Sequence, residues 1–94
     1  MKYQLLVEQD VQSAFADYLR AAREQAKLSR AALAEKSTVP ASTIKKFELT
    51  GQISFRQLLL LWQTLDDLKR LYALTQAQRS MTPTSIEEVL KDEF

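Results

Sequence analysis

Residues 29–50 read SRAALAEKSTVPASTIKKFELT, and this stretch predicts two short helices joined by a tight turn. Ser29 is a good N-cap for the first helix, because its hydroxyl can accept a hydrogen bond from an amide left unpaired at a helix start. Pro40 suits the first turn of the second helix and pushes Val39 out of helical geometry, so we expect the break at residues 37–39. Apolar residues recur at spacings that bury one side of each helix, and these are Leu33, Ala34, Val39, Ile44 and Phe47.

Charge is divided unevenly along the chain, although the formal net charge is only +1. Residues 20–46 include seven basic and two acidic residues, which gives +5, whereas residues 80–94 include one basic and four acidic residues, which gives −3. A basic helical hairpin suits phosphate, and an acidic tail suits a protein partner or solvent. The hairpin is therefore the part of the chain that we expect to meet a polyanion.

The composition limits what the chain can do. Ninety-four residues with one Gly and two Pro predict one mostly helical domain, too small for the common pocketed enzyme folds. The sequence has no Cys and no His, so disulfides, thiol chemistry and the usual metal ligands and imidazole bases are missing. No apolar run reaches membrane-spanning length and the N-terminus lacks signal-peptide features. We therefore expect a cytoplasmic protein that is not an enzyme, with no catalytic residues, no cofactor and no metal site.

Nine residues of the hairpin and its flanks follow the pattern LSQxxLAxxxGVSxSTIxxxExG, namely Leu28, Ser29, Leu33, Ala34, Val39, Ser42, Thr43, Ile44 and Glu48, and Gly51 lies one position after the last Gly of the pattern. In these residues the chain resembles the helix-turn-helix of the Cro/CI/Xre repressor family, which implies an all-α, five-helix, lambda-repressor-like DNA-binding domain. Arg30 replaces a Gln that usually touches phosphate, and Pro40-Ala41 replaces polar residues at the helix tip. Thr38 stands where a Gly with positive φ is usual, so the turn must either strain by roughly 1 kcal/mol or take another shape.

The second helix of the hairpin carries the candidate DNA contacts. Ser42, Thr43 and Lys45 are the candidates for hydrogen bonds to base edges, and Ala41 is a candidate for contact with a thymine methyl group. The candidates for phosphate contacts are Arg30, Lys46 and the helix start at Ser29. A twofold dimer would present two such helices to successive major grooves about 34 Å apart, so we expect an inverted-repeat operator.

The N-terminal part of the chain precedes the helical period. Residues 1–9 include the apolar run KYQLLV, which predicts a short strand that pairs with its twofold mate or a partner, or else an extended arm on the core. Asp10 can cap a helix that runs to about Lys27. On this helix Arg20 and Arg23 either touch phosphate or form surface pairs with neighbours such as Glu24. Residues 10–74 are predicted to form the helix-turn-helix domain.

After the hairpin, Ser54 and Gln57 match a capping box, and the following residues FRQLLLLWQTLDDLKRLYAL are apolar almost all round. We expect Phe55, Leu58, Leu59, Trp62 and Leu65 to cover the hairpin. A helix that is apolar on several sides must be buried on more than one, so we expect either a homodimer or a five-helix monomer core that takes up all the leucines. A break near Asp66-Asp67 would allow a last helix to start there. The predicted dimer-interface residues are Leu60, Leu61, Leu68, Leu71 and Tyr72.

The C-terminal part, residues 75–94, is predicted to be a polar linker and an acidic tail that folds against a partner or stays disordered. Over roughly residues 10–90, and most specifically over residues 54–74 with a later SIEEVL segment, the chain resembles small HipB-type regulators, the DNA-binding partners of HipA-like serine/threonine kinase toxins. That resemblance implies an antitoxin that represses its own operon and assembles with a kinase or an associated protein of such a system. A protein-interaction module that binds or inhibits a toxin partner without specific DNA binding is the alternative.

Overall fold

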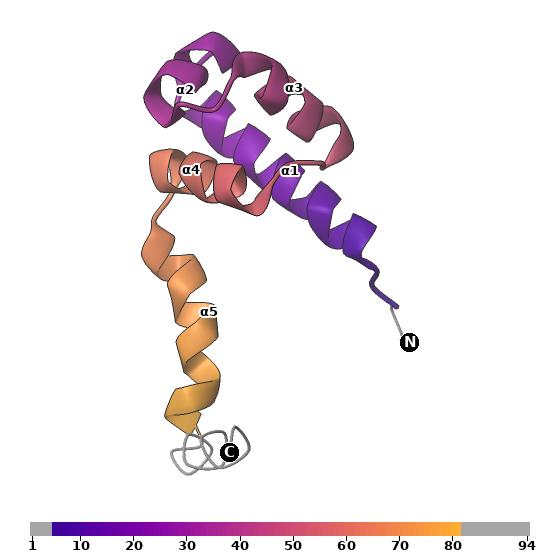
Figure 1. Cartoon of the computed structure of the whole chain (residues 1–94), viewed down its shortest axis with the longest axis vertical. Helices are drawn as coiled ribbons and strands as arrows, with labels where there is room; N and C mark the ends of the chain where they lie inside the picture. The colour runs from indigo at the N-terminus through magenta and orange to yellow at the C-terminus, as the bar shows by residue number, and fades with distance from the viewer. Residues whose placement is uncertain (1–4, 82–94) are drawn as a thin grey trace.

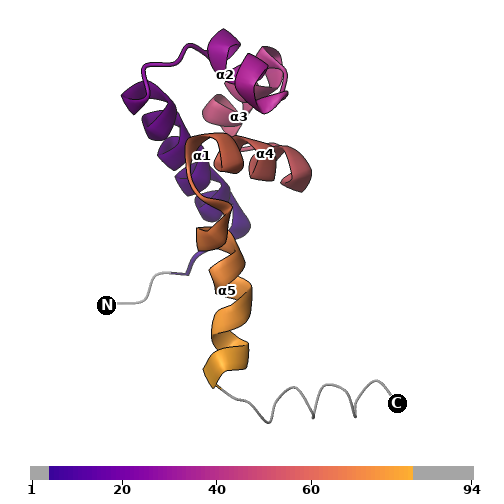
Figure 2. The same ribbon diagram turned by 90° about the vertical axis from the view of Figure 1, so that its left-hand side faces the viewer.

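The computed structural model describes residues 5–81, with side chains described as far as residue 77, and this part of the chain forms five helices (Figure 1). They are α1 (Glu8–Gln25), α2 (Arg30–Ser37), α3 (Ala41–Thr50), α4 (Phe55–Leu65) and α5 (Leu68–Met81). The first four pack together, whereas α5 projects away from them beyond the end of α4 (Figures 1 and 2). The prediction of an all-α, five-helix domain is confirmed.

One hydrophobic core joins α1 to α4. Its buried members are Ala16 and Leu19 of α1, Leu33 of α2, Val39 before α3, Ile44 and Phe47 of α3, and Leu61 and Trp62 of α4. The hairpin residues Leu33, Val39, Ile44 and Phe47 are each only 1% exposed. Burial of this kind contributes about 1.5–3 kcal/mol for each large aliphatic or aromatic side chain. The core therefore fixes α3 from behind and leaves its other side free.

The buried stripe of α4 differs from the predicted one. Ser54 is the N-cap, and its Oγ accepts from the Gln57 amide at 3.1 Å, so the helix begins at Phe55 as expected. The core side follows an i, i+3, i+4, i+7 pattern through Leu58, Leu61, Trp62 and Leu65. Leu60, a predicted dimer-interface residue, is partly buried and also packs against this core. Leu61 is 1% exposed within the single chain, so its assignment to a dimer interface is wrong. Phe55 lies outside this stripe and is 72% exposed, so it does not cover the hairpin.

The start of α1 also departs from expectation. Val7 is the N-cap, and the Asp10 carboxylate accepts from the Val7 amide at 3.0 Å, so Asp10 caps from inside the first turn and is not itself the N-cap. Of the strand predicted for residues 1–9, residues 5–7 have no regular structure and the last two lie in α1. Residues 1–4 lie outside the described part.

The last helix begins where the sequence indicates. The Asp67 carboxylate accepts from the Lys69 amide at 2.9 Å, which caps α5 after the break at Asp66-Asp67. The helix then continues to Met81, so the linker predicted to begin at Thr75 is wrong as far as residue 81. The predicted acidic tail lies outside the described residues from position 82 onward.

A polar cluster ties the first turn of α5 to α1 and α4. Arg70 Nη1 donates to the Tyr18 hydroxyl at 2.7 Å and to Asp66 Oδ2 at 2.8 Å, and the Tyr18 hydroxyl also donates to Asp66. The Tyr18 ring stacks on Trp62 with centroids 5.2 Å apart. Hydrogen bonds from the Tyr18 hydroxyl and the Asp67 amide, together with the charge of Arg70, hold the pKa of Asp66 below its usual value. These contacts set the direction in which α5 leaves the core.

The α2–α3 turn takes the first of the two conformations expected for it, the strained one with positive φ at Thr38. Thr38 has φ 68°, a left-handed conformation that costs a β-branched residue about 1–2 kcal/mol. Thr38→Gly removes this cost but adds conformational entropy to the unfolded chain, so we expect a net gain of about 0.5–1 kcal/mol in the free energy of unfolding. Urea denaturation followed by the fluorescence of the single tryptophan measures it.

Gly51 provides the opposite control, because it has φ 81° and no side chain to strain. A Cβ at this position would lie 3.1 Å from Gln12 Cβ and 3.2 Å from the Gln12 carbonyl carbon. Gly51→Ala should therefore lower stability by about 1 kcal/mol or more. A loss of stability in Thr38→Gly would show that the turn is not strained.

Candidate nucleic-acid interface

The turn between α2 and α3 is set by local hydrogen bonds. Ser29 Oγ accepts from the Ala32 amide at 3.0 Å, so Ser29 caps α2 as predicted. At the other end, the Val39 amide donates to Ser37 Oγ at 3.1 Å. Pro40 is the N-cap residue of α3, one position before its predicted place in the first turn. The break between the two helices lies at residues 38–40, within one residue of the prediction. It makes α3 a separate helix that packs on the core.

The outward side of α3 carries the predicted contact residues. Ser42, Lys45 and Lys46 are exposed, whereas Ala41 and Thr43 are half-buried. All five lie opposite the buried pair of Ile44 and Phe47 or at the edge of it. The exposed set therefore offers one hydroxyl and two ammonium groups on a helix anchored by its other side.

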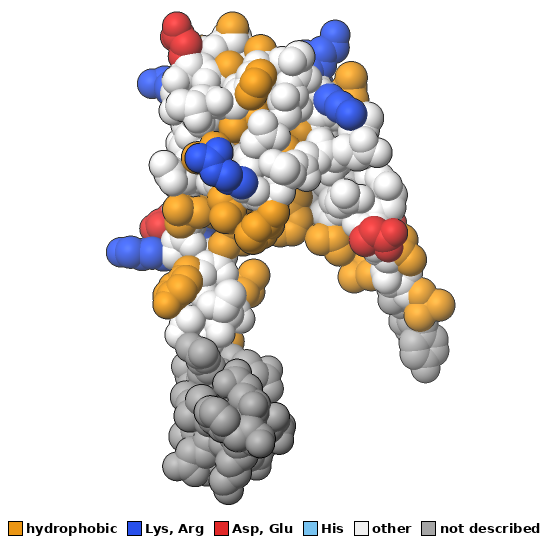
Figure 3. Space-filling model, viewed as in Figure 1, with side chains coloured by type: hydrophobic (Ala, Val, Ile, Leu, Met, Phe, Trp, Pro, Cys, Tyr) orange, Lys and Arg blue, Asp and Glu red, His pale blue; other side chains and the backbone are white. Residues whose placement is uncertain are grey.

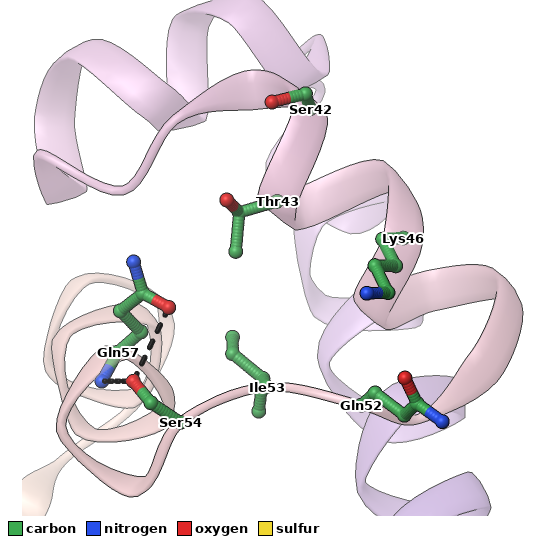
Figure 4. A pocket seen from close by; sticks show the side chains of 7 residues that line it. All are labelled: Ser42, Thr43, Lys46, Gln52, Ile53, Ser54 and Gln57. Atoms are coloured by element: carbon green, nitrogen blue, oxygen red, sulfur yellow. Dashed lines mark hydrogen bonds between the residues drawn. The ribbon is translucent and has the colours of Figure 1, made fainter.

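A polar cavity of about 440 Å³ separates α3 from the loop and helix that follow it. Figure 4 shows Ser42, Thr43 and Lys46 of α3 on one side, facing Gln52 and Gln57 on the other. Ile53 and Ser54 complete the lining. The cavity is thus bounded by hydroxyl, ammonium and amide groups, which are the groups that proteins use to hold phosphate and sugar.

The start of α4 strengthens this site for an anion. Ser54 Oγ accepts from the Gln57 amide and donates to Gln57 Oε1 at 3.2 Å (Figure 4). The first amides of a helix point outward along the positive end of its dipole, a favourable position for phosphate. Lys46 reaches the same cavity from α3. The cavity therefore combines a helix start with a lysine, whereas Lys45 does not line it.

A buried ion-pair network holds the C-terminal half of α3 to α1 and α2. Arg23 Nε donates to Glu48 Oε2 at 2.7 Å, and Arg30 Nε donates to Glu48 Oε1 at 2.9 Å. Arg23 also donates through Nη1 to the Leu28 carbonyl at 2.8 Å. The side chain of Glu48 is 2% exposed, that of Arg23 10% and that of Arg30 33%. Burial opposes the charge of Glu48, but hydrogen bonds from both arginines outweigh it and lower its pKa.

This network corrects the predictions for the arginines. Arg23 neither reaches phosphate nor forms the predicted surface pair with Glu24, because it is buried against Glu48. Arg20 does form the predicted surface pair, with Nε 3.3 Å from Glu24 Oε2. Arg30 keeps a third of its side chain exposed, so its predicted phosphate contact stays a prediction for the part of the guanidinium that Glu48 does not hold.

Residues 14–81 match the protein-family model described as a helix-turn-helix domain. The chain belongs to the helix-turn-helix family. This family makes it a DNA-binding regulator of transcription, in agreement with the anchored, basic and polar face of α3. No curated protein and no solved structure matches the chain.

Two further properties of the helix-turn-helix domain bear on function. Domains of this family are typically non-enzymatic. Among the residues that the structure describes, no three acidic, His or Cys residues are grouped so that they could hold a metal ion. Over the same residues, no helix has the length and apolarity needed to cross a membrane.

Part of the surface beside α3 follows from the sequence and part does not. Gln52 belongs to the loop predicted for residues 49–53, whose polar residues are expected to touch the DNA backbone, and it lines the cavity. Ser54 and Gln57 also line it, but their pattern indicates only a helix cap. The sequence does contain a signal for their position. Only four residues separate the second hairpin helix from the next helix, so the capped start of that next helix must lie beside it.

Proposed function

We propose that this chain is a sequence-specific transcriptional repressor that places α3 in the major groove of an inverted-repeat operator as a twofold dimer. The observation that supports this proposal most strongly is the pairing of a buried and an exposed side on α3. Ile44 and Phe47 are 1% exposed, while Ser42, Lys45 and Lys46 face outward. A helix anchored in this way can enter a groove without unfolding the core behind it.

In this proposal the contact residues form two groups, those that contact bases and those that contact phosphates. Ser42 and Lys45 read base edges, with Ala41 and Thr43 at the helix edge contacting a thymine methyl and a base or sugar. Lys46 and the start of α4 hold one phosphate in the polar cavity. The helix start at Ser29, with Arg30 positioned by Glu48, holds another. Phosphate contacts set the position of the protein, and Ser42 and Lys45 set its sequence preference.

Salt-dependent binding to DNA upstream of the chain's own gene tests the proposal. A specific repressor should prefer this DNA to random duplex by about 10³-fold or more, and log K should fall with log salt with a slope near −0.9 for each phosphate contact. Equal, weak binding to both duplexes would instead favour a protein-interaction module. The exposed Leu49 on α3, 64% exposed, is the observation that favours this second candidate.

Lys45→Ala should reduce sequence preference without reducing non-specific binding. Lys45 is exposed on α3 and lies outside the phosphate cavity, so its ammonium is free to reach a guanine edge. We expect a loss of about 1–2 kcal/mol on the operator, equal to roughly 5–30-fold, and little change on random duplex. Fluorescence anisotropy with both duplexes measures this. Equal losses on the two duplexes would show that Lys45 contacts phosphate.

We also propose that the chain is the antitoxin and autoregulator of a HipA-like kinase operon. The support is the resemblance to HipB-type regulators, strongest over residues 54–74. A neighbouring reading frame for a HipA-like kinase, and relief of its growth inhibition on co-expression with this chain, are the expected results. Neighbouring genes without a kinase would remove this part of the proposal and leave the DNA-binding part intact.

A further inference from the structure

The outward face of α3 has one large apolar side chain among its polar ones. Leu49 is 64% exposed and lies outside the core. It follows Lys45 by four residues and Lys46 by three, so the three side chains are neighbours on one face of the helix. Ser42 begins the same face one turn earlier. We call Ser42, Lys45, Lys46 and Leu49 the α3 stripe, and all four are exposed.

The position of Leu49 is more informative than its exposure. A single exposed leucine is common on protein surfaces and by itself indicates nothing. Leu49 differs because it lies one turn beyond Lys45 and Lys46, the residues to which the proposed function gives a base contact and a phosphate contact. Whatever covers these two ammonium groups therefore also covers the leucine.

The charges of α3 indicate what covers the α3 stripe. Lys45 and Lys46 are exposed, whereas the acidic residue of this helix, Glu48, has a side chain that is 2% exposed and paired with two arginines. Figure 3 shows basic and hydrophobic side chains together at the upper right edge of the molecule, which α3 forms. Lysine is depleted in the cores of protein–protein interfaces, but DNA phosphates neutralise it. The stripe therefore suits DNA better than an apolar protein partner.

DNA offers such a leucine one kind of partner in the major groove. Adenine, guanine and unmodified cytosine present hydrogen-bond donors and acceptors there, whereas thymine also presents its C5-methyl group. A leucine side chain makes no hydrogen bond, but it can exclude water from a methyl group. The chemistry of Leu49 therefore matches a C5-methyl group, whether on thymine or on 5-methylcytosine.

We infer that Leu49 contacts the C5-methyl group of one thymine in each half-site of the operator and so adds a preference for that base. This inference rests on the proposed function and deepens it with a specificity residue. Ala41, the other candidate for a methyl contact, lies eight residues earlier, which is about 12 Å along the helix. Successive base pairs are about 3.4 Å apart, so Ala41 and Leu49 contact different base pairs.

Uracil substitution in the DNA tests the contact without changing the protein. Deoxyuridine pairs with adenine as thymidine does and lacks only the C5-methyl group. Each thymine of the duplex from upstream of the gene is replaced in turn, in both half-sites, and affinity is measured by fluorescence anisotropy. At the thymine that Leu49 contacts we expect a loss of about 4-fold for one half-site and about 15-fold for both, the effect of one methyl-sized apolar group in each.

The same titrations with Leu49→Ala assign the loss to this side chain. For Leu49→Ala the thymine and uracil duplexes should bind within about 2-fold of each other at that position, because the methyl group has lost its partner. Ala41→Gly is the matched control and should keep the full loss there. Leu49→Met keeps an apolar side chain of similar volume and should keep most of it. Since Leu49 is exposed, Leu49→Ala should leave the urea midpoint unchanged, which separates a DNA contact from an effect on folding.

Cytosine methylation gives a second measurement, in which affinity rises. The sensitive thymine is replaced by cytosine, and the resulting duplex is compared with one that has 5-methylcytosine at the same position. The methylated duplex should bind about 4-fold more tightly for each half-site, because the C5-methyl group is restored. Leu49→Ala should bind the two duplexes equally. Equal binding of both duplexes by the unsubstituted chain would contradict the contact.

These results separate the contact from the proposed function. If the chain prefers its upstream duplex to random duplex but no uracil loss depends on Leu49, the repressor stands and the methyl contact is overturned. Unchanged binding of Leu49→Ala to every duplex would likewise overturn the contact and point to a protein partner for this face. If the unsubstituted chain binds upstream and random duplex equally, the repressor itself is overturned, and the Leu49 contact with it.

Discussion

Replacing Glu48 with alanine should lower the free energy of unfolding by about 3–5 kcal/mol, which is the usual cost of removing one partner from a buried ion pair. The Glu48 side chain is 2% exposed and accepts hydrogen bonds from both Arg23 and Arg30. Without it, Arg23 stays buried with only the Leu28 carbonyl as acceptor. Domains are typically stable by about 5–15 kcal/mol, so the variant should lose a large fraction of its stability. Urea denaturation monitored through Trp62 measures the loss.

Two other variants separate the contribution of burial to the stability loss from the contribution of charge. Glu24→Ala removes an exposed partner, since both side chains of the Arg20 pair are about half exposed, and should cost no more than about 0.5 kcal/mol. Glu48→Gln keeps the acceptor oxygen but not the charge and should fall between the two. A loss below about 1 kcal/mol in Glu48→Ala would mean that the arginines find other partners.

The same network makes stability depend on pH. Hydrogen bonds from Arg23 and Arg30 hold the pKa of Glu48 in the folded chain below its ordinary value. The contribution of Glu48 to stability is therefore complete above the unfolded pKa and is lost as the pH falls through the folded pKa. Unmodified chain should lose stability on acidification more steeply than Glu48→Gln, and the two should converge in acid. Parallel pH profiles would show that Glu48 does not supply this dependence.

Local signals in the sequence are enough to place the hairpin. Ser29, Thr38 and Gly51 mark the ends of α2 and α3 because capping and positive φ depend on a few neighbouring residues. Ser54 marks the start of α4 for the same reason. The exposure of Lys45 and Lys46 follows from the helical period alone.

Features that depend on distant residues are not predictable in this way. Arg23 lies on the buried side of α1 because Glu48, 25 residues later, neutralises it there. Helical periodicity treats an arginine as a surface residue and contains no information about such a partner. The length of α5 differs from the prediction for another reason, since its polar second half suggests a linker although Gln, Ala and Arg favour helix.

The candidate site is predictable from α3 but not from what faces it. Ser42 and Lys46 lie on the predicted helix and Gln52 lies in the loop that follows it, whereas Gln57 joins them because α4 turns back beside α3. That arrangement is set by the core contact of Leu61 and Trp62, which the sequence pattern assigns to different surfaces. The sequence pattern does not predict this stripe of α4, because Leu61 is buried where an interface residue is expected and Phe55 is exposed where a core residue is expected.

Reversing the charge of Lys46 should reduce affinity for the operator by roughly 100-fold, because like charges at an interface cost several kcal/mol. Lys46 lines the polar cavity beside the start of α4, where a phosphate of the proposed complex would lie. Lys46→Glu removes one phosphate contact and places a carboxylate next to another anion. The salt slope should become less steep by about 0.9 when this contact is removed. Anisotropy titrations at several salt concentrations measure both quantities, on operator and random duplex alike.

Lys36→Glu makes the same change in net charge at another exposed position, in the last turn of α2. Long-range attraction to DNA depends on net charge and is screened beyond about 10 Å at 0.1 M salt, so this control should reduce affinity only a few-fold. Because Lys46 acts on the phosphate backbone, its replacement should weaken binding to operator and random duplex similarly, unlike Lys45→Ala. Equal effects of the two reversals would mean that DNA responds to net charge alone and that the cavity between α3 and α4 holds no phosphate.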